Sequence, residues 1–227
     1  MNKQLPIHID LLDKGFIELQ DIMGDDNSIV AAARVSFLGE SKGEAQDKKL
    51  IAYLLRNRHT SPFEQVIFKF RVKCPLFVAR QWMRHRTWHY NEISRRYTSE
   101  ALDFYMPEEW RLQSSDNKQC SEGSADGNIQ QQFSAQTQTI VDTALSTYER
   151  MVEAGIAREQ ARMILPQNMY TTFIGSVDLH NLLHFLILRR EQHAQYEIRV
   201  YADAIYEHAV KPFVPWTAEA AEKHVFS

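Results

Sequence analysis

The segment from Arg80 to Tyr97 holds the residues with the clearest chemical potential. It contains five arginines and one carboxylate, Glu92, in a chain whose formal net charge is −3. Guanidinium groups present planar donors that match phosphate and carboxylate oxygens. This cationic segment therefore predicts an anionic ligand that carries phosphates. A solvated basic loop is the alternative, but aromatic residues are poorly placed in such a loop, and four are interleaved here: Trp82, Trp88, Tyr90 and Tyr97.

Further arginines lie in two other parts of the chain, Arg158 with Arg162 and Arg189 with Arg190. The sequence contains no GxGxxG and no GxxxxGK[ST] motif, so phosphate binding must depend on side chains. Most arginines are solvated surface residues, but Arg189 directly follows an apolar run. A guanidinium in apolar surroundings needs a partner to offset its desolvation. A bound ligand is one such partner.

Several other side chains have more than one interpretation. His180 and His184 are four residues apart, on one face of an expected helix. The pair could bind a metal together with a third ligand, pack in the core, or hydrogen-bond to an organic ligand. The sequence has no HExxH motif that would favour the metal site. The roles of His59, His85 and His89 are open in the same way. Ser94 is not in a GxSxG elbow, and nothing activates Cys74, so neither is expected to be a nucleophile.

The composition is that of a soluble globular protein, with 44% hydrophobic and 24% charged residues in 227. This length predicts one large domain or two small ones. There is no overall basic excess of the kind that nucleic-acid-binding proteins show. Cys74 and Cys120 form no disulfide framework, and the chain shows no signal peptide and no membrane span. We therefore expect a reduced, cytoplasmic setting.

In the first half of the chain, residues 1–25 predict one or two short strands, and a helix is expected after Asp26. A second helix is predicted for 47–58, before a break at Pro62. Alternation of Phe68, Phe70 and Val72 with basic residues predicts a half-buried strand. A helix that starts near Pro75 should carry the residues that open the cationic segment on one face: Gln81, Arg84 and His85.

In the second half, residues 112–132 are rich in Ser, Asn, Asp and Gln and are predicted to form a mobile loop. A long helix should run from Phe133 to a C′ position at Gly155. Further predictions are a short helix at 157–164, a strand at 170–177, a helix capped by Asp178, and a helix at 192–210. Because strands and helices do not alternate regularly, the fold class is α+β, with a mixed or antiparallel sheet and packed helices in a single domain, 1–227.

The cationic segment also resembles the signature of a known family. Arg84-His85-Arg86, seven further residues and Ser94 are similar to the motif of the flavin-dependent thymidylate synthases (the ThyX family). Other blocks occur in the family's order across about residues 28–216: His59 to Glu64, Asn91 to Tyr97, Ala161 to Pro166 and Leu188 to Gln195. An ordered set of blocks is more specific than any one of them.

The resemblance implies an enzyme that methylates dUMP to dTMP. Methylenetetrahydrofolate would supply the carbon, and FAD reduced by NADPH would supply the hydride, in a homotetramer with shared active sites. Arg189 would activate the uracil ring. Implied FAD contacts are His59, Ser61, Arg84, His85, Arg86, Glu92, Asp178, Leu179, His180 and His184. Implied dUMP contacts are Gln81, Trp82, Met83, Arg84, Glu92, Ile93, Ser94, Arg95, Arg96, Arg162 and Arg189.

The chain departs from the family's usual residues at His89, His180 and His184. Imidazole nitrogens can hydrogen-bond, so contact with FAD can survive these changes. Two functions from other classes remain as alternatives. One is a nucleotide- or single-strand-binding module without catalysis. The other is a metal-dependent hydrolase built on His180 and His184.

Overall fold

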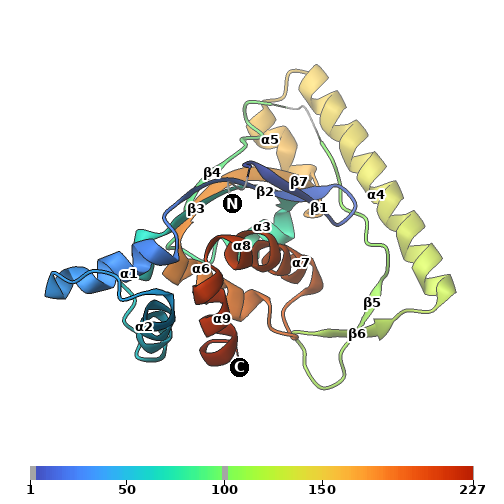
Figure 1. Cartoon of the computed structure of the whole chain (residues 1–227). Helices are drawn as coiled ribbons and strands as arrows, with labels where there is room; N and C mark the ends of the chain where they lie inside the picture. The colour runs from blue at the N-terminus through green and yellow to red at the C-terminus, as the bar shows by residue number, and fades with distance from the viewer. Residues whose placement is uncertain (1–3, 99–101, 227) are drawn as a thin grey trace.

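A five-stranded antiparallel sheet forms the centre of the molecule, in a computed structural model that describes residues 4–98 and 102–226. Helices α6 to α9 lie on one side of the sheet, α1 and α2 at one end, and α4 at the other (Figure 1). This arrangement confirms the α+β class. The strands, in spatial order, are β1 (Ile7–Leu11), β2 (Gly15–Met23), β3 (Ile67–Pro75), β7 (Tyr170–Asp178) and β4 (His89–Glu92).

The central strand β3 has the predicted alternation. Phe68, Phe70 and Val72 are buried in the main core, while Lys69 and Arg71 point to the exposed face. The strand pairs along its whole length with β7, from Ile67 opposite Asp178 to Pro75 opposite Tyr170. The strands predicted before residue 25 and at 170–177 are also confirmed.

Contacts between α1 and α9 join segments near the two ends of the chain. Asp26, at the start of α1, is buried and accepts hydrogen bonds from the backbone of Trp216 and Thr217 at 2.7 and 3.0 Å. Burial raises the pKa of this carboxyl. The helices below and beside the sheet are α1 (Asp26–Arg34), α2 (Glu44–Arg56), α6 (Leu179–Arg189), α7 (Tyr196–Ile205), α8 (Lys211–Phe213) and α9 (Pro215–His224). No helix in the described ranges has both the length and the apolarity needed to cross a bilayer.

The segment predicted as a mobile loop at 112–132 is instead ordered. It contains a hairpin of β5 (Arg111–Gln113) and β6 (Ser121–Ser124), followed by the start of α4 (Gly127–Glu153). The helix begins six residues before the predicted Phe133, because the Asp126 carboxylate accepts from the backbone of Asn128 and Ile129 as an N-cap. Gly155, with a φ of 84°, does occupy the predicted C′ position.

The helix near Pro75 does not carry Gln81, Arg84 and His85 on one face, as was predicted. Helix α3 (Leu76–Trp82) ends before Arg84, so Arg84, His85 and Arg86 lie in the turn beyond it. The following residues form β4, which was not predicted. The short helix at 157–164 is confirmed as α5 (Arg158–Ala161) and a 3₁₀ turn (Arg162–Ile164). Helix α7 starts at Tyr196, four residues after the prediction, and continues as a π-helical turn (Tyr206–Val210), whereas α8 and α9 were not predicted.

Candidate active site

A cavity of about 530 Å³ opens between the end of α2, the segment that follows it, α6 and the end of α9. Its volume is in the range of sites for organic ligands. Four histidines line it, beside apolar Phe63 and Leu183, and this mixture of ring nitrogens and apolar walls suits a flat heteroaromatic group. The full lining is Leu54, Leu55, Arg56, Arg58, His59, Thr60, Phe63, His180, Leu183, His184, Ile187, His224 and Val225.

Helix α6 carries two of these histidines into the cavity. Asp178 caps the helix, because its carboxylate accepts from the backbone nitrogen of Asn181 at 2.9 Å and from the Asn181 side chain at 2.7 Å. His180 and His184 then lie one turn apart on the face that borders the cavity. Leu179 and Leu182 are fully buried against the core.

A metal centre finds no support in this geometry. Within residues 4–98 and 102–226, no group of three or more His, Cys, Asp or Glu side chains is arranged to hold a metal ion. His180 and His184 therefore lack a third protein ligand in that part of the chain. The hypothesis of a metal-dependent hydrolase built on this pair loses its structural basis.

Arg189, at the end of α6, reaches across to the cationic segment. Its Nε donates to His85 Nε2 at 3.1 Å, and its Nη2 donates to the Gln81 backbone carbonyl at 3.3 Å. The His85 ring in turn lies 6.0 Å from the ring of His184, which lines the cavity. Burial lowers the pKa of Arg189, as does the nearby charge of Arg84. Two separate parts of the chain thus meet beside the cavity.

His85 is held as a neutral imidazole. Burial is the main cause that lowers its pKa to about 4, and the charges of Arg189 and His184 act in the same direction. Since Nε2 accepts the hydrogen bond from Arg189, the proton of the neutral ring is on Nδ1. His85 is therefore an Nδ1–H donor beside a permanent cation.

This protonation state predicts a pH dependence of stability. The pKa of an unfolded histidine is about 6.5. Above that pH, His85 is neutral in both the folded and the unfolded state, and its titration does not lower the stability of the fold. As the pH falls toward the folded pKa of about 4, the unfolded state binds the proton first and stability decreases. We expect a loss of roughly 3 kcal/mol from this residue.

Urea unfolding of the protein and of a His85→Gln variant at a series of pH values between neutrality and the folded pKa checks this prediction. The variant should lose less stability than the wild-type protein as the pH falls. Equal losses in the two proteins would contradict it.

A second group of polar residues lies along β4 and just after it. Glu92 accepts a hydrogen bond from Thr171 Oγ1 on β7 at 2.6 Å. Arg95 is buried and donates to the Tyr170 carbonyl at 3.4 Å, and burial lowers its pKa. Ser94 Oγ accepts from the backbone nitrogen of Arg96 at 3.3 Å. Glu92 and Arg95 are thus held by residues of β7, whereas Ser94 lies just beyond the end of β4.

Comparison with known proteins identifies the family. A family model described as thymidylate synthase complementing protein matches residues 18–216. A flavin-dependent thymidylate synthase from Thermus thermophilus is 51% identical over 220 residues, which cover 97% of this chain and 80% of the relative. The chain belongs to the flavin-dependent thymidylate synthase family. A relative from Treponema denticola, 48% identical over 217 residues, covers 94% of this chain and 81% of its own length.

The fold of the family member is also found among solved structures. The UMP/dUMP methylase PolB from Streptomyces cacaoi, bound with 5-Br dUMP, is similar with a TM-score of 0.86 and 33% identity. The similarity covers 95% of this chain and 97% of that chain. Membership of an enzyme family decides against the alternative of a non-catalytic nucleotide- or single-strand-binding module.

The structure brings some of the family residues together and separates others. Gln81, His85 and Arg189 are in direct contact, near His184. Ser61 is exposed, and its neighbours Thr60 and Phe63 line the cavity in its place. Further exposed residues of the family blocks include Arg84, Arg86, Glu92, Ile93, Arg96 and Arg162. The hydrogen bond described for Arg162 is a local one, from Nε to the Glu159 carbonyl at 3.4 Å.

Two apolar residues with an implied ligand contact have fully buried side chains. Trp82 is 0% exposed, and its ring packs in the core against Phe185 and Phe173. Leu179 is also 0% exposed. Their side chains have no surface to offer a ligand, and Met83 packs partly against the same core. Cys74 is buried too, which raises the pKa of its thiol well above the usual value and agrees with a structural role.

Other residues of the site were missed by sequence reasoning. His224 and Val225 line the cavity from the end of α9, outside the blocks that carry the resemblance. Glu197 is buried beside Gln195, which ends one of those blocks. A buried glutamate leaves no signature in a single sequence, and a C-terminal histidine gains meaning only through packing.

Proposed function

We propose that this protein converts dUMP to dTMP by reductive methylation, with methylenetetrahydrofolate as the carbon donor and NADPH as the reductant through FAD. The contact of Arg189 with His85 carries the proposal, because it leaves a permanent cation next to the ligand cavity. The family membership and the likeness to a methylase bound with 5-Br dUMP support the same reaction.

We propose that the flavin occupies the cavity at α6. Apolar walls such as Phe63 and Leu183 suit a planar ring, and His59, His180 and His184 offer hydrogen bonds to its polar edge. Arg56 and Arg58 on the same lining provide charge for a pyrophosphate. When bound, FAD supplies the redox chemistry of the reaction. From the family pattern, the further contacts are Ser61, Arg84, His85, Arg86, Glu92, and the segment from Asp178 to His180.

The nucleotide is proposed to lie between Arg189 and the β4 residues. A guanidinium at the uracil edge stabilises negative charge that develops on the ring, which is electrostatic stabilisation of the transition state. Neutral His85 keeps this guanidinium in place without competing for its charge. Gln81, Glu92, Arg95, Arg96 and Arg162 would then bind the sugar, base and phosphate.

A direct assay tests the proposed function. Purified protein should carry a flavin spectrum, and dTMP should form only when dUMP, methylenetetrahydrofolate and NADPH are all present. NADPH oxidation should respond to dUMP. A flavin-free protein, or one that forms no dTMP with all components present, would overturn the proposal.

Ser94 is proposed to contact the substrate and not to be a nucleophile. In the described part of the chain its Oγ is bonded to the Arg96 backbone, and no His or carboxylate is bonded to it. We expect Ser94→Ala to weaken dUMP binding by about tenfold, the effect of one lost hydrogen bond, while turnover persists. Titration calorimetry and the dTMP assay measure the two effects. Ser146→Ala, on exposed α4, is the control and should match the wild type. Complete loss of turnover with normal dUMP binding would restore the nucleophile interpretation.

We propose a single domain that assembles as a homotetramer with active sites shared between subunits, as the family resemblance implies. The residues assigned to dUMP fall into two groups within one chain, one at Gln81 and Arg189 and one at β4. A shared site would combine these groups from different subunits. Light scattering of the purified protein tests the assembly, and a monomeric mass with full activity would overturn it.

A further inference from the structure

Glu197, on α7, is a buried carboxylate with three hydrogen-bond donors around it. Its exposed fraction is 3%. Oε1 accepts from Arg111 Nη2 at 2.6 Å and from the Tyr105 hydroxyl at 3.2 Å, and Oε2 accepts from Gln195 Nε2 at 2.9 Å. Burial alone would raise its pKa, but the bonds from Arg111 and Gln195 hold the pKa below the usual value. Glu197 is therefore an ionised group that can only accept.

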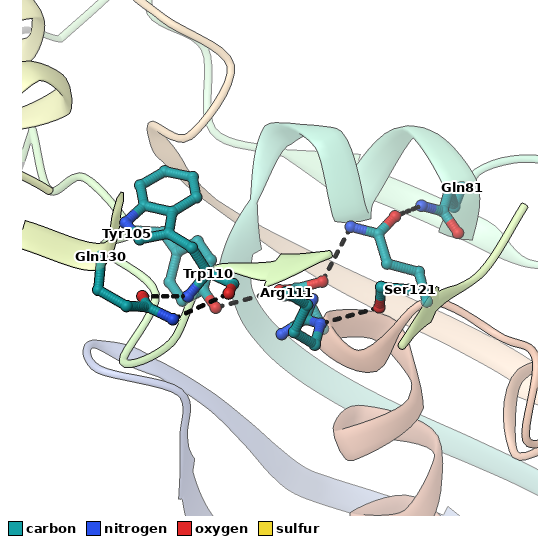
Figure 2. Close-up of polar contacts among 8 residues, drawn as sticks. Gln81, Tyr105, Trp110, Arg111, Ser121 and Gln130 are labelled. Atoms are coloured by element: carbon teal, nitrogen blue, oxygen red, sulfur yellow. Dashed lines mark hydrogen bonds and ion pairs between the residues drawn. The ribbon is translucent and has the colours of Figure 1, made fainter. Parts of the chain in front are cut away.

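This acceptor sets the orientation of two amides in series. Because Gln195 must direct its Nε2 to the carboxylate, its Oε1 faces the other way and accepts from Gln81 Nε2. Gln81 in turn has its Nε2 engaged, so its Oε1 is on the opposite edge of the amide. Figure 2 shows this line of contacts from Gln81 to Arg111, with the Gln81 oxygen directed away from the contact.

We propose that Gln195 and Glu197 are positioning residues that fix the Gln81 amide so that its Oε1 accepts a hydrogen bond from a donor group of the bound nucleotide. The inference rests on the proposed function, in which Gln81 contacts dUMP. The donor is a ring N–H or a hydroxyl, since dUMP carries both, at uracil N3 and at the 3′ position of the sugar.

Glu197, Gln195 and Gln81 form a hydrogen-bonded relay, and the reverse orientation of its two amides is unfavourable. If Gln195 were flipped, its Oε1 would face the buried Glu197 carboxylate, and two acceptors would meet without a proton between them. Gln81 is also held at its backbone, where its carbonyl accepts from Arg189 at 3.3 Å. Both the main chain and the side chain of Gln81 are thus oriented before a ligand arrives.

The far end of the relay is anchored on the β5–β6 hairpin. Arg111 Nε donates to Ser121 Oγ at 3.0 Å, and its guanidinium lies over the Tyr196 ring at 4.9 Å. The backbone nitrogen of Trp110 is bonded to Gln130 on α4 at 2.7 Å, as Figure 2 also shows. The hairpin therefore keeps Arg111 on Glu197, which keeps the carboxylate ionised.

A Glu197→Gln variant tests the relay because it should invert it. Arg111 and Tyr105 still donate, so Oε1 of the new amide must remain with them, and its Nε2 then faces Gln195. Gln195 flips, and Gln81 presents Nε2 to the ligand instead of Oε1. Tyr105→Phe is the matched control: it removes one donor from the same carboxylate but leaves the polarity of the relay intact.

The measurement is the affinity of the flavin-loaded proteins for three nucleotides by titration calorimetry. These are dUMP, 3-methyl-dUMP, which lacks the ring N–H, and 2′,3′-dideoxyuridine monophosphate, which lacks the 3′-hydroxyl. We expect wild-type protein to bind one of the two analogues about tenfold more weakly than dUMP, which identifies the donor. Glu197→Gln should bind dUMP about tenfold more weakly than wild type does. Glu197→Gln should bind the analogue that lacks the identified donor as tightly as wild-type protein binds it. Tyr105→Phe should bind all three nucleotides as wild-type protein does.

An equal loss for all three nucleotides in Glu197→Gln would indicate a merely structural role and overturn the inference alone. So would wild-type protein that binds both analogues as well as dUMP. A Gln195→Met variant tests the inference even if Glu197→Gln fails to fold, because it removes the amide between Glu197 and Gln81 and leaves the charge of Glu197 in place. It should lessen discrimination between dUMP and the analogue. Unchanged discrimination would overturn the inference. Wild-type protein that does not bind dUMP would overturn the proposed function and the inference together.

Discussion

Arg189→Ala should retain bound flavin and lose dTMP formation by about 1,000-fold, an effect of the size seen when one preorganised transition-state donor is removed. The guanidinium is part-buried and uses its Nε and Nη2 to hold His85 and the Gln81 carbonyl. Donors remain on the group for a ligand, since a guanidinium carries five N–H bonds. If Arg189 activates the substrate as proposed, charge that develops on the uracil ring would have no adjacent cation in this variant. The dTMP assay and the flavin spectrum measure the two parts of this prediction.

Two further variants separate charge from geometry at this position. Arg189→Lys keeps a positive charge but loses the planar fork, so its activity should lie between those of Arg189→Ala and the wild type. Arg190→Ala is the neighbouring control, because Arg190 pairs with Asp203 at 3.0 Å and lies over the Tyr206 ring at 3.8 Å. It should lower thermal stability without comparable loss of turnover. Full activity in Arg189→Ala would show that this residue does not activate the substrate.

Trp82→Ala should destabilise the fold by about 3–5 kcal/mol, the usual cost of truncating a buried aromatic residue. The Trp82 side chain is 0% exposed and contacts four aromatic rings with centroid distances between 4.8 and 5.8 Å: Phe185, Phe173, Trp88 and Tyr201. Its removal leaves a cavity in the main core that these large rings cannot fill. Urea unfolding measures the loss.

Trp82→Phe is the control for this change. In the described structure the indole Nε1 of Trp82 has no hydrogen-bond partner, so phenylalanine removes volume but no hydrogen bond. The loss should be smaller than for alanine, and dUMP affinity should stay near that of the wild type. Unaltered stability of Trp82→Ala together with lost dUMP binding would instead favour the ligand contact that the family pattern implied.

Local patterns account for the parts of the fold that were predicted correctly. Strand β3 follows from alternation of apolar and basic residues, and α6 follows from Asp178 ahead of an apolar run. Such signals arise within a few residues of one another, so they survive in a single sequence. The C′ glycine at Gly155 has the same origin, because a positive φ suits glycine.

The errors occur where distant contacts override local preference. The four residues of β4 are polar and lie in a cationic segment, yet they form a strand because β7 offers an unpaired edge. Helix α3 ends at Trp82, and the single hydroxyl proton of Tyr90 is shared between the carbonyls of Trp82 and His85, at 3.1 and 3.0 Å. The hairpin at 111–124 becomes ordered through Arg111 and the buried Glu197.

The sequence by itself determined the family, through ordered blocks around Arg84, Ser94, Arg162 and Arg189, and the main strands and helices, through periodicity. Only the tertiary structure decided which of these residues meet. Arg189 contacts His85 from 104 residues away and Gln81 from 108, and Trp82 turned out to be core. The physical reason is that periodicity specifies one face of one element, whereas contact between elements depends on how the whole chain packs.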